Sequence, residues 1–316
     1  MSERTNDLHS LLHPRSVAIV GASDNPDKVG GRPLRHLISH GYAGRLYPVN
    51  PRGTPVQGLD SATSLAALPE VPDVALLCVP AERAGEEIEA CARLGIPNVL
   101  LFSSGFAEVG VAGRAAQESL AATCRGAGIR LLGPNMLGVA NFENGAVLSF
   151  ASAYLDYPHR DGPVAIVSQS GGFGAAAYAL LRNNGLGVRY VCTTGNQADL
   201  DVADFALELA RDESLRVMLI YLEEVKQASA LRCALDAARR RGIRVSLPYF
   251  LPAPTLIGTF GAFIKSNSPF TSRRDLLEVG AYGPIAGFVV AVVVLAIALG
   301  DVTYRQVPVD IAPVGN

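Results

Sequence analysis

Short apolar runs alternate with helix-like segments over the first 245 residues of the chain. Each apolar run is rich in β-favouring residues and bounded by glycine, proline or asparagine, as strands of a buried sheet are. The segments between them are rich in Ala, Glu, Leu and Arg, which favour helices. The predicted strands are 17–20, 45–50, 74–79, 98–103, 129–132, 163–168, 187–193 and 215–222, and the predicted helices are 29–39, 61–68, 81–94, 111–127, 173–183, 201–211 and 226–240.

Strands that are apolar throughout and separated by helices predict an α/β fold with a parallel sheet covered on both faces. Ligands of such sheets bind beyond the carboxyl ends of the strands. Polar and turn residues collect at those ends, which indicates a binding crevice there. These segments are Gly21–Lys28, Val49–Pro51, Val79–Pro80, Ser103–Glu108 and Gly133–Asn135.

The turn after the first strand has the outline of a phosphate site. Gly21 allows a sharp turn and a close approach of the backbone to a ligand, and Lys28 adds a positive charge. The helix expected from Val29 offers free N–H groups and the positive end of its dipole. A phosphate-bearing cofactor fits these features, although the G-x-G-x-x-G spacing typical of NAD sites is missing. An ordinary strand-to-helix turn with surface charges is the alternative.

A second glycine-rich turn follows the strand that begins at Pro163. Ser168 and Ser170 place two hydroxyls beside the backbone N–H groups of a helix start, which favours an anion. Serine-hydrolase chemistry is disfavoured because Ser168 replaces the first glycine of the G-x-S-x-G elbow. Glu223 follows a later strand and is a candidate partner for a cationic or imidazole group, with a solvated turn as the alternative.

Composition narrows the class of protein. The length of 316 residues suggests about two domains, and the net charge of −2 argues against a nucleic-acid partner. The five cysteines form no C-x-x-C pair, so neither a disulfide framework nor a zinc ribbon is predicted. Residues 1–12 are polar and do not look like a secretory signal. A cytoplasmic location is therefore expected, with no metal site.

Several of these motifs together resemble the NDP-forming acyl-CoA synthetases, relatives of the succinyl-CoA synthetase α subunit. The resemblance spans about residues 11–245. It implies a CoA-binding Rossmann-like domain over 1–140, a linker over 141–161 and a truncated flavodoxin-like domain over 162–245. The motifs that carry it are Gly21–Gly30, Tyr47–Pro51, Ser104–Glu108, Gly133–Asn135, Val167–Gly174, Gly195–Asp199 and Tyr221–Glu223.

The resemblance also implies roles for individual residues. Ser168, Ser170 and Gly171 would cradle the phosphoryl group of a phosphohistidine, and Glu223 would orient that histidine. The implied activity is that of an acid–thiol ligase, which converts an acyl phosphate and CoA to an acyl-CoA. A small carboxylic acid would be the substrate, and an ATP-grasp subunit or domain would bring ATP or ADP and Mg. The residues implied for CoA are Gly21, Ala22, Ser23, Lys28, Val49, Asn50, Pro51, Val79, Pro80 and Asn135.

The histidines depart from this family pattern. The family carries its phosphohistidine after the segment that ends at Val245, whereas the last histidine of this sequence is His159. His159 remains a minor candidate for the phosphate carrier. His36 and His40, four residues apart on one helix, are expected to be a surface pair and not a zinc site. A non-catalytic CoA-binding or regulatory module is therefore a second hypothesis.

The composition changes after residue 245. Residues 246–300 resemble an internal fragment of the site-2 proteases, which are membrane zinc metalloproteases. Residues 279–300 carry no charge and are long enough for a transmembrane helix, with a buried core helix as the alternative. Arg273 and Arg274 would lie on the cytoplasmic side. The H-E-x-x-H motif is missing, so a chimera of a synthetase part and a protease fragment is inferred. A membrane-tethered protein is the third hypothesis.

Overall fold

The computed structural model of the chain describes residues 8–246, 250–252 and 259–263. The elements from α1 (His9–Leu12) to β11 (Arg244–Val245) belong to one compact unit. The predicted transmembrane helix at 279–300 lies outside the described residues. Within the described ranges, none of the helices combines the length and apolar character that crossing a bilayer requires.

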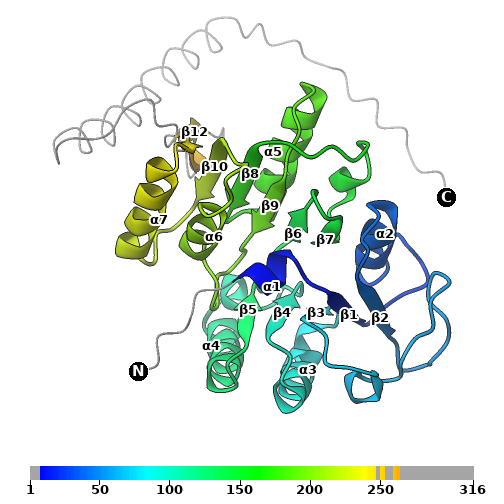
Figure 1. Ribbon diagram of the computed structural model, residues 1–316. Coiled ribbons are helices and arrows are strands. Elements are labelled where there is room, and N and C mark those ends of the chain that lie inside the picture. Colours follow the sequence, from blue (N-terminus) through cyan, green and yellow to red (C-terminus); the bar gives the residue numbers. More distant parts are fainter. Residues whose placement is uncertain (1–7, 247–249, 253–258, 264–316) are drawn as a thin grey trace, which may run out of the picture. The chain divides into compact units, whose positions relative to one another are not determined.

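The first half of the unit is a parallel five-stranded sheet with the order β2-β1-β3-β4-β5 (Figure 1). This arrangement confirms the α/β class predicted from the apolar runs. The strands begin and end close to the predicted positions, and every residue of β1, β3 and β4 is buried. Their bounds are β1 (Ser16–Val20), β2 (Arg45–Val49), β3 (Val74–Leu77), β4 (Asn98–Leu101) and β5 (Arg130–Leu132).

Alternate residues of β1 show that this sheet is covered on both faces. Val17 and Ile19 pack in one apolar core with Leu34 of α2, whereas Ala18 belongs to a second core. The second core also holds residues of α3 and α4. The helical elements of this half are α2 (Arg32–Ser39), α3 (Ala81–Leu94) and α4 (Val111–Gly126), with short 3-10 helices η1 (Leu65–Ala67) and η2 (Ala107–Val109).

The helix predicted over 61–68 is wrong except for the three residues of η1. Ala62 instead continues the sheet at the end of β2. Its N–H donates to the carbonyl oxygen of Pro48 at 3.0 Å, and its carbonyl oxygen accepts from the N–H of Asn50 at 2.9 Å. Pairing of the Ala62 backbone with β2 excludes it from a helix, because an α-helix uses those same groups within itself.

The second half of the unit contains a mixed sheet. Strands β8, β9 and β10 are parallel, whereas β6 and β7 form an antiparallel hairpin that pairs with β9. The end of β13 (Thr259–Phe263) pairs antiparallel with β10. The other strand described beyond residue 249 is β12 (Phe250–Pro252). The remaining elements are β6 (Gly138–Asn141), β7 (Ala146–Ser149), η3 (Ser152–Tyr154), β8 (Val164–Ser168), α5 (Gly171–Asn183), β9 (Tyr190–Thr193), α6 (Val202–Leu209), β10 (Val217–Leu222) and α7 (Ala228–Arg240).

The segment 141–161, predicted as a linker, is built into the second sheet. It contains β7 and η3, and the Tyr154 side chain is fully buried. One apolar core also contains side chains from both halves, among them Val17 and Leu34 with Val167 and Phe205. The two halves therefore share buried surface and pack against each other.

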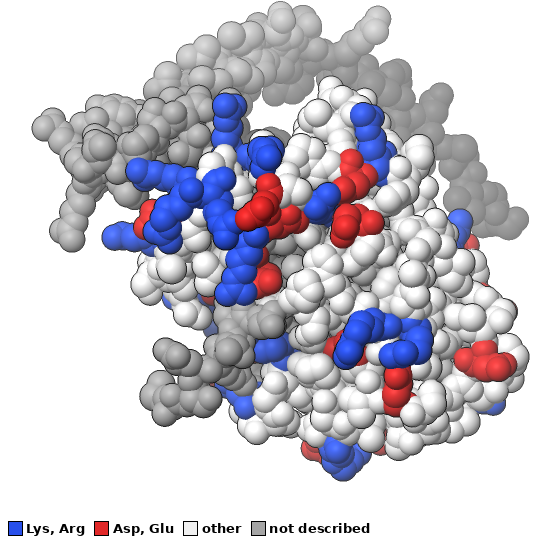
Figure 2. All heavy atoms as spheres, in the orientation of Figure 1, with Lys and Arg blue, Asp and Glu red and all other residues white. Residues whose placement is uncertain are grey.

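Charged side chains are distributed unevenly over the surface. Figure 2 shows Lys and Arg gathered over the region of α7, with acidic side chains beside them. That helix contributes Arg232, Arg239 and Arg240. Further Lys and Arg side chains appear elsewhere on the same face, interspersed with acidic ones (Figure 2).

His36 is not on the surface, contrary to the sequence-based expectation. Its side chain is fully buried, and its ring lies 6.1 Å from that of Tyr154, centroid to centroid. Because burial disfavours the charged imidazolium, and His40 adds to this effect, the pKa of His36 is lowered to about 3. The described residues contain no group of three or more His, Cys, Asp and Glu side chains arranged to hold a metal ion.

The buried His36 predicts loss of stability in mild acid. Unfolded His36 takes up a proton near pH 6.5, whereas the folded protein keeps it neutral down to about pH 3. The contribution of neutral His36 to the free energy of unfolding is therefore fully present above pH 6.5 and decreases as the pH falls toward 3. Between pH 7 and 4.5 we expect this one group to lower the free energy of unfolding by about 2–3 kcal/mol.

Urea unfolding at those two pH values would measure the effect. The variant His36→Leu should lose stability by that much less than the wild-type chain over the same interval. An equal loss in both proteins would contradict the assignment to His36.

Candidate functional site

The turn after β1 is tied to the end of β2 by backbone hydrogen bonds. The N–H groups of Gly21 and Ala22 both donate to the carbonyl oxygen of Val49, at 3.0 and 3.1 Å. The Asn50 amide donates to the carbonyl oxygen of Ala22 at 2.8 Å. The structure thus brings together four of the residues predicted to bind CoA.

Gly21 is required by the geometry of this turn. Its φ of +79° lies in the left-handed region, and a Cβ there would lie 2.5 Å from the backbone oxygen of Cys78. Real Cβ atoms do not approach a carbonyl oxygen so closely. Only glycine lets the backbone adopt this conformation between β1 and β3.

Gln57 supports the same turn from outside and was missed in the sequence. Its side-chain amide donates to the carbonyl oxygens of Ser23 and Gly31, at 3.1 and 2.9 Å. Its own N–H donates to the Asp24 carboxylate at 2.8 Å. No motif marks Gln57, because its role depends on a loop more than 25 residues away along the chain.

Helix α2 offers fewer free N–H groups than predicted. It begins at Arg32 and not at Val29. The N–H groups of Gly31 and Arg32 already donate to the Lys28 carbonyl oxygen, each at 2.9 Å, and Pro33 has no N–H. The exposed Lys28 side chain is therefore the clearest group in this turn for holding a phosphate.

The loops after β3 and β4 continue the same edge. The Ser103 hydroxyl donates to the carbonyl oxygen of Val79, and Pro80 precedes the first residue of α3. Val79 is buried, whereas Pro51 and Pro80 are exposed. The edge from β2 to β4 is consequently one continuous run of loops with exposed positions for a ligand.

A pocket of about 390 Å³ lies where the loops of both sheets meet. The loops that follow β4, β5, β7, β8, β9 and β10 all contribute to it. The predicted residues Asn135, Ser170, Gly171 and Glu223 are among its lining residues. The other lining residues are Phe102, Ser104, Met136, Leu137, Phe150, Gln169, Gly172, Gly195 and Asn196. Of these, sequence reasoning gave no sign of Phe102, Met136, Leu137 and Phe150.

Ser170 and Ser168 have different roles. Ser170 caps α5, since its hydroxyl oxygen accepts from the N–H of Phe173 at 3.3 Å. Ser168 is fully buried and does not line the pocket. Its hydroxyl donates to the carbonyl oxygen of Ser170 at 2.6 Å. Ser168 therefore shapes the turn from the core side, and its contact with a phosphoryl group stays a prediction.

Glu223 is held over the start of α5 by Gln169. The side-chain oxygen of Gln169 accepts from the N–H groups of Glu223 and Glu224, at 2.9 and 3.0 Å. The N–H of Gln169 in turn donates to the carbonyl oxygen of Tyr221 at 3.0 Å. The backbone of Glu223 is thus fixed, and its exposed side chain starts from a defined position at the pocket.

A second cavity of about 400 Å³ adjoins the first and shares Asn196 and Glu223 with it. The Asn196 amide donates to Glu108 at 2.5 Å and to Gln117 at 3.0 Å. Burial alone would raise the pKa of Glu108, but hydrogen bonds from Asn196 and from the backbone lower it overall. Glu108 therefore joins the two halves as a carboxylate.

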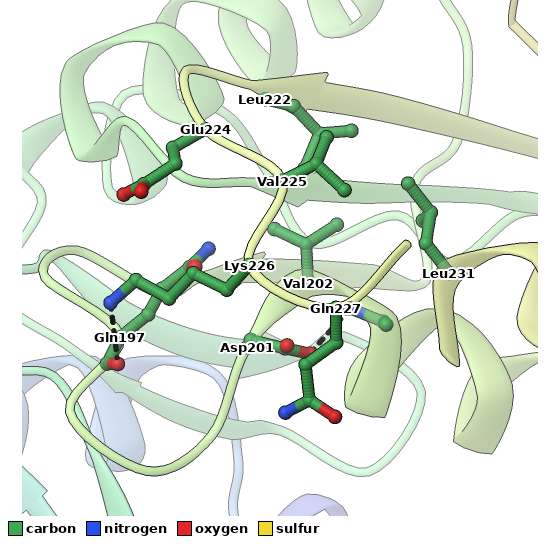
Figure 3. Close-up of a pocket in the computed structure, with 10 residues that line it drawn as sticks. Gln197, Asp201, Val202, Leu222, Glu224, Val225, Lys226, Gln227 and Leu231 are labelled. Atoms are coloured by element: carbon green, nitrogen blue, oxygen red, sulfur yellow. Dashed lines mark hydrogen bonds between the residues drawn. The ribbon is translucent and has the colours of Figure 1, made fainter. Parts of the chain in front are cut away.

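Lys226 closes a much smaller pocket beside this network (Figure 3). Its ammonium group donates to the carbonyl oxygens of Asn196 and Gln197, at 2.9 and 3.0 Å. Asp201, in the same view, caps α6 by accepting from the N–H of Ala203 at 2.8 Å. The pocket volume of about 10 Å³ is no larger than one water molecule needs. Lys226 therefore supports the loop at Asn196 and Gln197. The pocket itself is too small for a substrate.

His159 does not reach either of the larger cavities. Its Nε2 lies against the carbonyl oxygen of Phe142, and its ring packs edge-on to that of His40. It is absent from the described lining of both cavities, which contains no histidine. The minor prediction that His159 carries phosphate is therefore wrong for this arrangement.

Comparison with known proteins agrees with this geometry. Residues 15–141 match the CoA binding domain, and residues 161–246 match the succinyl-CoA ligase like flavodoxin domain. The α subunit of acetate–CoA ligase [ADP-forming] I from Pyrococcus furiosus is 34% identical over 243 residues. These two regions are thus a CoA binding domain and a succinyl-CoA ligase like flavodoxin domain, and this part of the chain is similar to the NDP-forming acyl-CoA synthetase family.

Structures of synthetases of this family support the assignment of the fold. The dinucleotide-forming acetyl-coenzyme A synthetase 1 of Ca. Korarchaeum cryptofilum, in complex with phosphate and ADP, has a TM-score of 0.70 and 31% identity. That match covers 80% of this chain and 53% of the synthetase chain. The P. furiosus match covers 75% of this chain and 52% of the α subunit. The chain thus spans about half the length of these synthetases.

A further match concerns a different class of protein. Over 59 residues, 19% of this chain, the identity is 46% to a probable zinc metalloprotease, EGY2, of Oryza sativa subsp. indica. The match covers 11% of that protease. It agrees with the site-2-protease resemblance noted in the sequence, whereas the synthetase family accounts for the two described sheets.

Proposed function

We propose that the chain is the CoA-binding component of an NDP-forming acyl-CoA synthetase. The observation that carries this proposal is the pocket where Ser170, Gly171 and Glu223 from the second sheet face Asn135 from the first. An anion-binding helix start and a carboxylate next to a CoA-binding domain are the groups that such a ligase needs.

The reaction proposed for the complete enzyme ends with transfer of the acyl group to CoA. The CoA sulfur forms a bond to the acyl carbon of an acyl phosphate, and the bond from that carbon to the phosphate oxygen breaks. The N–H groups at the start of α5 would hold the phosphate as it leaves. A phosphohistidine supplies the phosphoryl group for the acyl phosphate, and Glu223 would orient that imidazole by accepting its N–H.

The remaining partners are proposed from the relatives. The K. cryptofilum structure contains phosphate and ADP, which supports a nucleotide as part of the reaction. We propose that an ATP-grasp subunit or domain brings this nucleotide with Mg, and that a small carboxylic acid is the acyl donor. The P. furiosus relative is named as an α subunit, which favours a separate partner.

A non-catalytic CoA-binding module is the second candidate function. The favouring observation is that the last histidine of the sequence, His159, packs against Phe142 and not in the pocket. Incubation with labelled ATP and an ATP-grasp partner distinguishes the candidates. Formation of an acyl-CoA from CoA and a small carboxylic acid in this mixture supports the synthetase, and CoA binding without acyl-CoA formation supports the module.

Attachment to a membrane through residues 279–300 is a separate proposal from the sequence. The uncharged run of that segment supports it. Fractionation of cells that express the full chain tests it. Recovery in the membrane fraction after a high-salt wash is expected, and full recovery in the soluble fraction contradicts it.

Calorimetric titration of CoA into the full chain tests the proposed cofactor. We expect Lys28→Ala to weaken CoA binding roughly tenfold, because an exposed ammonium on a phosphate contributes one charge-assisted contact. Dephospho-CoA should bind more weakly than CoA to the wild-type chain. The matched control is Ser170→Ala, which should leave CoA affinity within about twofold. Equal losses in both variants would contradict two separate sites.

A further inference from the structure

The first described segment of the chain is held against the second sheet by polar contacts that the proposed function does not use. We define the N-terminal segment as Leu8–His13, which contains α1 and precedes β1. It buries Leu8, Leu11 and Leu12 in the core that both halves share. His13 ends the segment and is half-buried. Its imidazole contacts the β6–β7 hairpin and the start of β9 in the second half.

Two asparagines of the hairpin are oriented as donors toward His13. The Asn141 amide nitrogen lies 3.4 Å from His13 Nδ1 and donates to the Leu12 carbonyl oxygen at 3.1 Å. The Asn144 amide nitrogen lies 3.2 Å from the same Nδ1 and 3.3 Å from the same carbonyl oxygen. The oxygens of both amides accept from backbone N–H groups of their own turn, at 3.0 and 2.9 Å. Exchanging oxygen and nitrogen in either amide would therefore lose contacts on both sides.

The other nitrogen of the His13 ring fits the same direction of hydrogen bonding. The Tyr190 hydroxyl donates to the Asp212 carboxylate at 3.0 Å. The hydroxyl oxygen is therefore left to accept from His13 Nε2, 3.4 Å away. Nδ1 thus accepts while Nε2 carries the proton, which is a neutral imidazole. All the donors in this row point toward Asp212, and hydrogen bonds in such a row strengthen one another.

A proton on Nδ1 would oppose this arrangement. An imidazolium has no acceptor, so its Nδ1–H would face two amide groups that are themselves donors. Burial opposes the charge on His13 most, and His9, whose ring stacks on that of His13 with centroids 4.5 Å apart, adds to this effect. Arg189 also opposes the charge, whereas Glu143 and Asp212 favour it. The balance lowers the pKa of His13.

We propose that the N-terminal segment is a pH-sensitive latch, which is tightest while His13 is neutral and opens more often once His13 takes up a proton. In the open latch His13 regains an ordinary pKa near 6.5. Closing is therefore favoured fully above that pH, and less as the pH falls toward the lowered pKa of the closed form. The three buried leucines keep the closed form dominant at neutral pH.

The latch is independent of the proposed CoA and phosphate sites. His13 precedes β1, and Asp212 lies in the loop before β10, so both lie at the amino ends of parallel strands. The proposed sites follow the strands, at the opposite ends. Failure of the latch would therefore leave the proposed function untouched.

NMR titration of the full chain, isotope-labelled at the histidine nitrogens, tests the hydrogen-bond assignment. The sequence has five histidines, so His13→Gln identifies the His13 signals by their loss. We expect wild-type His13 to carry its proton on Nε2 at neutral pH and to titrate below pH 6.5. Asn144→Asp replaces one donor by a carboxylate that accepts from Nδ1–H, and it should strengthen proton binding at His13 at least about tenfold.

The matched control is Asn184→Asp, which makes the same charge change at the exposed end of α5. It should leave the titration of His13 unchanged. A proton on Nδ1 at neutral pH, a wild-type titration at or above pH 6.5, or equal titrations in the two aspartate variants would each overturn the proposal.

Hydrogen exchange of the Leu12 amide measures the opening itself. This N–H donates to the Leu8 carbonyl oxygen at 3.1 Å, so it exchanges when the segment opens. From pH 7.5 to 5.5 the opening equilibrium, corrected for intrinsic exchange, should rise about five- to tenfold more in the wild-type chain than in His13→Gln. His36 is the same in both chains, so its own acid effect cancels. Equal pH dependence in both chains would overturn the latch. Should His13→Gln fail to fold, His13→Asn takes its place in the same comparison.

Discussion

The substitution Gly21→Val is expected to abolish measurable CoA binding and to lower the free energy of unfolding by about 3 kcal/mol. Two costs add. A β-branched residue at φ +79° is strained by roughly 1–3 kcal/mol. Its Cβ, moreover, would meet the Cys78 backbone oxygen at 2.5 Å and push the turn away from β3, with an overpacking cost of about 1–3 kcal/mol. Urea unfolding and CoA titration measure the two effects.

Gly41→Val is the matched control for that substitution. Gly41 has a φ of +69°, but a Cβ there meets no atom within 4 Å. This variant should show the conformational cost alone, about 1–2 kcal/mol, with unchanged CoA affinity. A folded Gly21→Val chain that binds CoA as tightly as the Gly41→Val chain would contradict the phosphate-turn assignment.

The substitution Arg189→Met is expected to lower the free energy of unfolding by about 2–3 kcal/mol. The Arg189 guanidinium forms two hydrogen bonds with Asp161, at 3.0 and 2.5 Å, and a third with Ser214 at 2.5 Å. It also lies 3.5 Å from the Asp212 carboxylate. These side chains are only 19–30% exposed. Removal of the cation takes the ion-pair partner from two partly buried carboxylates, although Asp212 keeps hydrogen bonds from Tyr190 and Ser214. This loss costs more than loss of a surface pair and less than loss of a fully buried one.

The pKa of Arg189 is consistent with this ion-pair network. The hydrogen bonds that Arg189 donates to Asp161 raise the pKa of Arg189, so the guanidinium stays charged. A suitable comparison is Arg83→Met, which breaks an i,i+4 pair with Glu87 on α3 where Arg83 is half exposed. That variant should change stability by less than about 0.5 kcal/mol. Similar losses from both variants would show that the Arg189 network has no special weight.

The fold was predictable where apolar runs were long and bounded by turns. Val74–Leu77 and Val164–Ser168 lie within their predicted strands because every residue in them is buried. The hairpin of β6 and β7 was missed, since four-residue strands that include Gly138 and Asn141 carry too weak a pattern. The pairing of β6 with β9 is decided by distant sequence, as is common for β-structure.

The site was predictable only in part. Glycine and serine turns revealed the positions of Gly21, Ser170 and Gly171, because those residue types have a local effect on the backbone. The sequence could not separate Ser168 from Ser170, since the difference is that one hydroxyl faces the core. The same holds for Phe102 and Phe150, which are about 50 residues apart and meet only through tertiary packing.

The hairpin of β6 and β7 has a consequence for synthesis of the chain. Asn141, at the end of β6, pairs with Tyr190, at the start of β9, so 49 further residues must be made before that partner appears. At about 5–20 residues per second the ribosome needs roughly 2–10 s for this. During that interval the open edge of β6 is free to pair with another nascent chain. Crowded polysomes would therefore be the place where this protein is most vulnerable to aggregation.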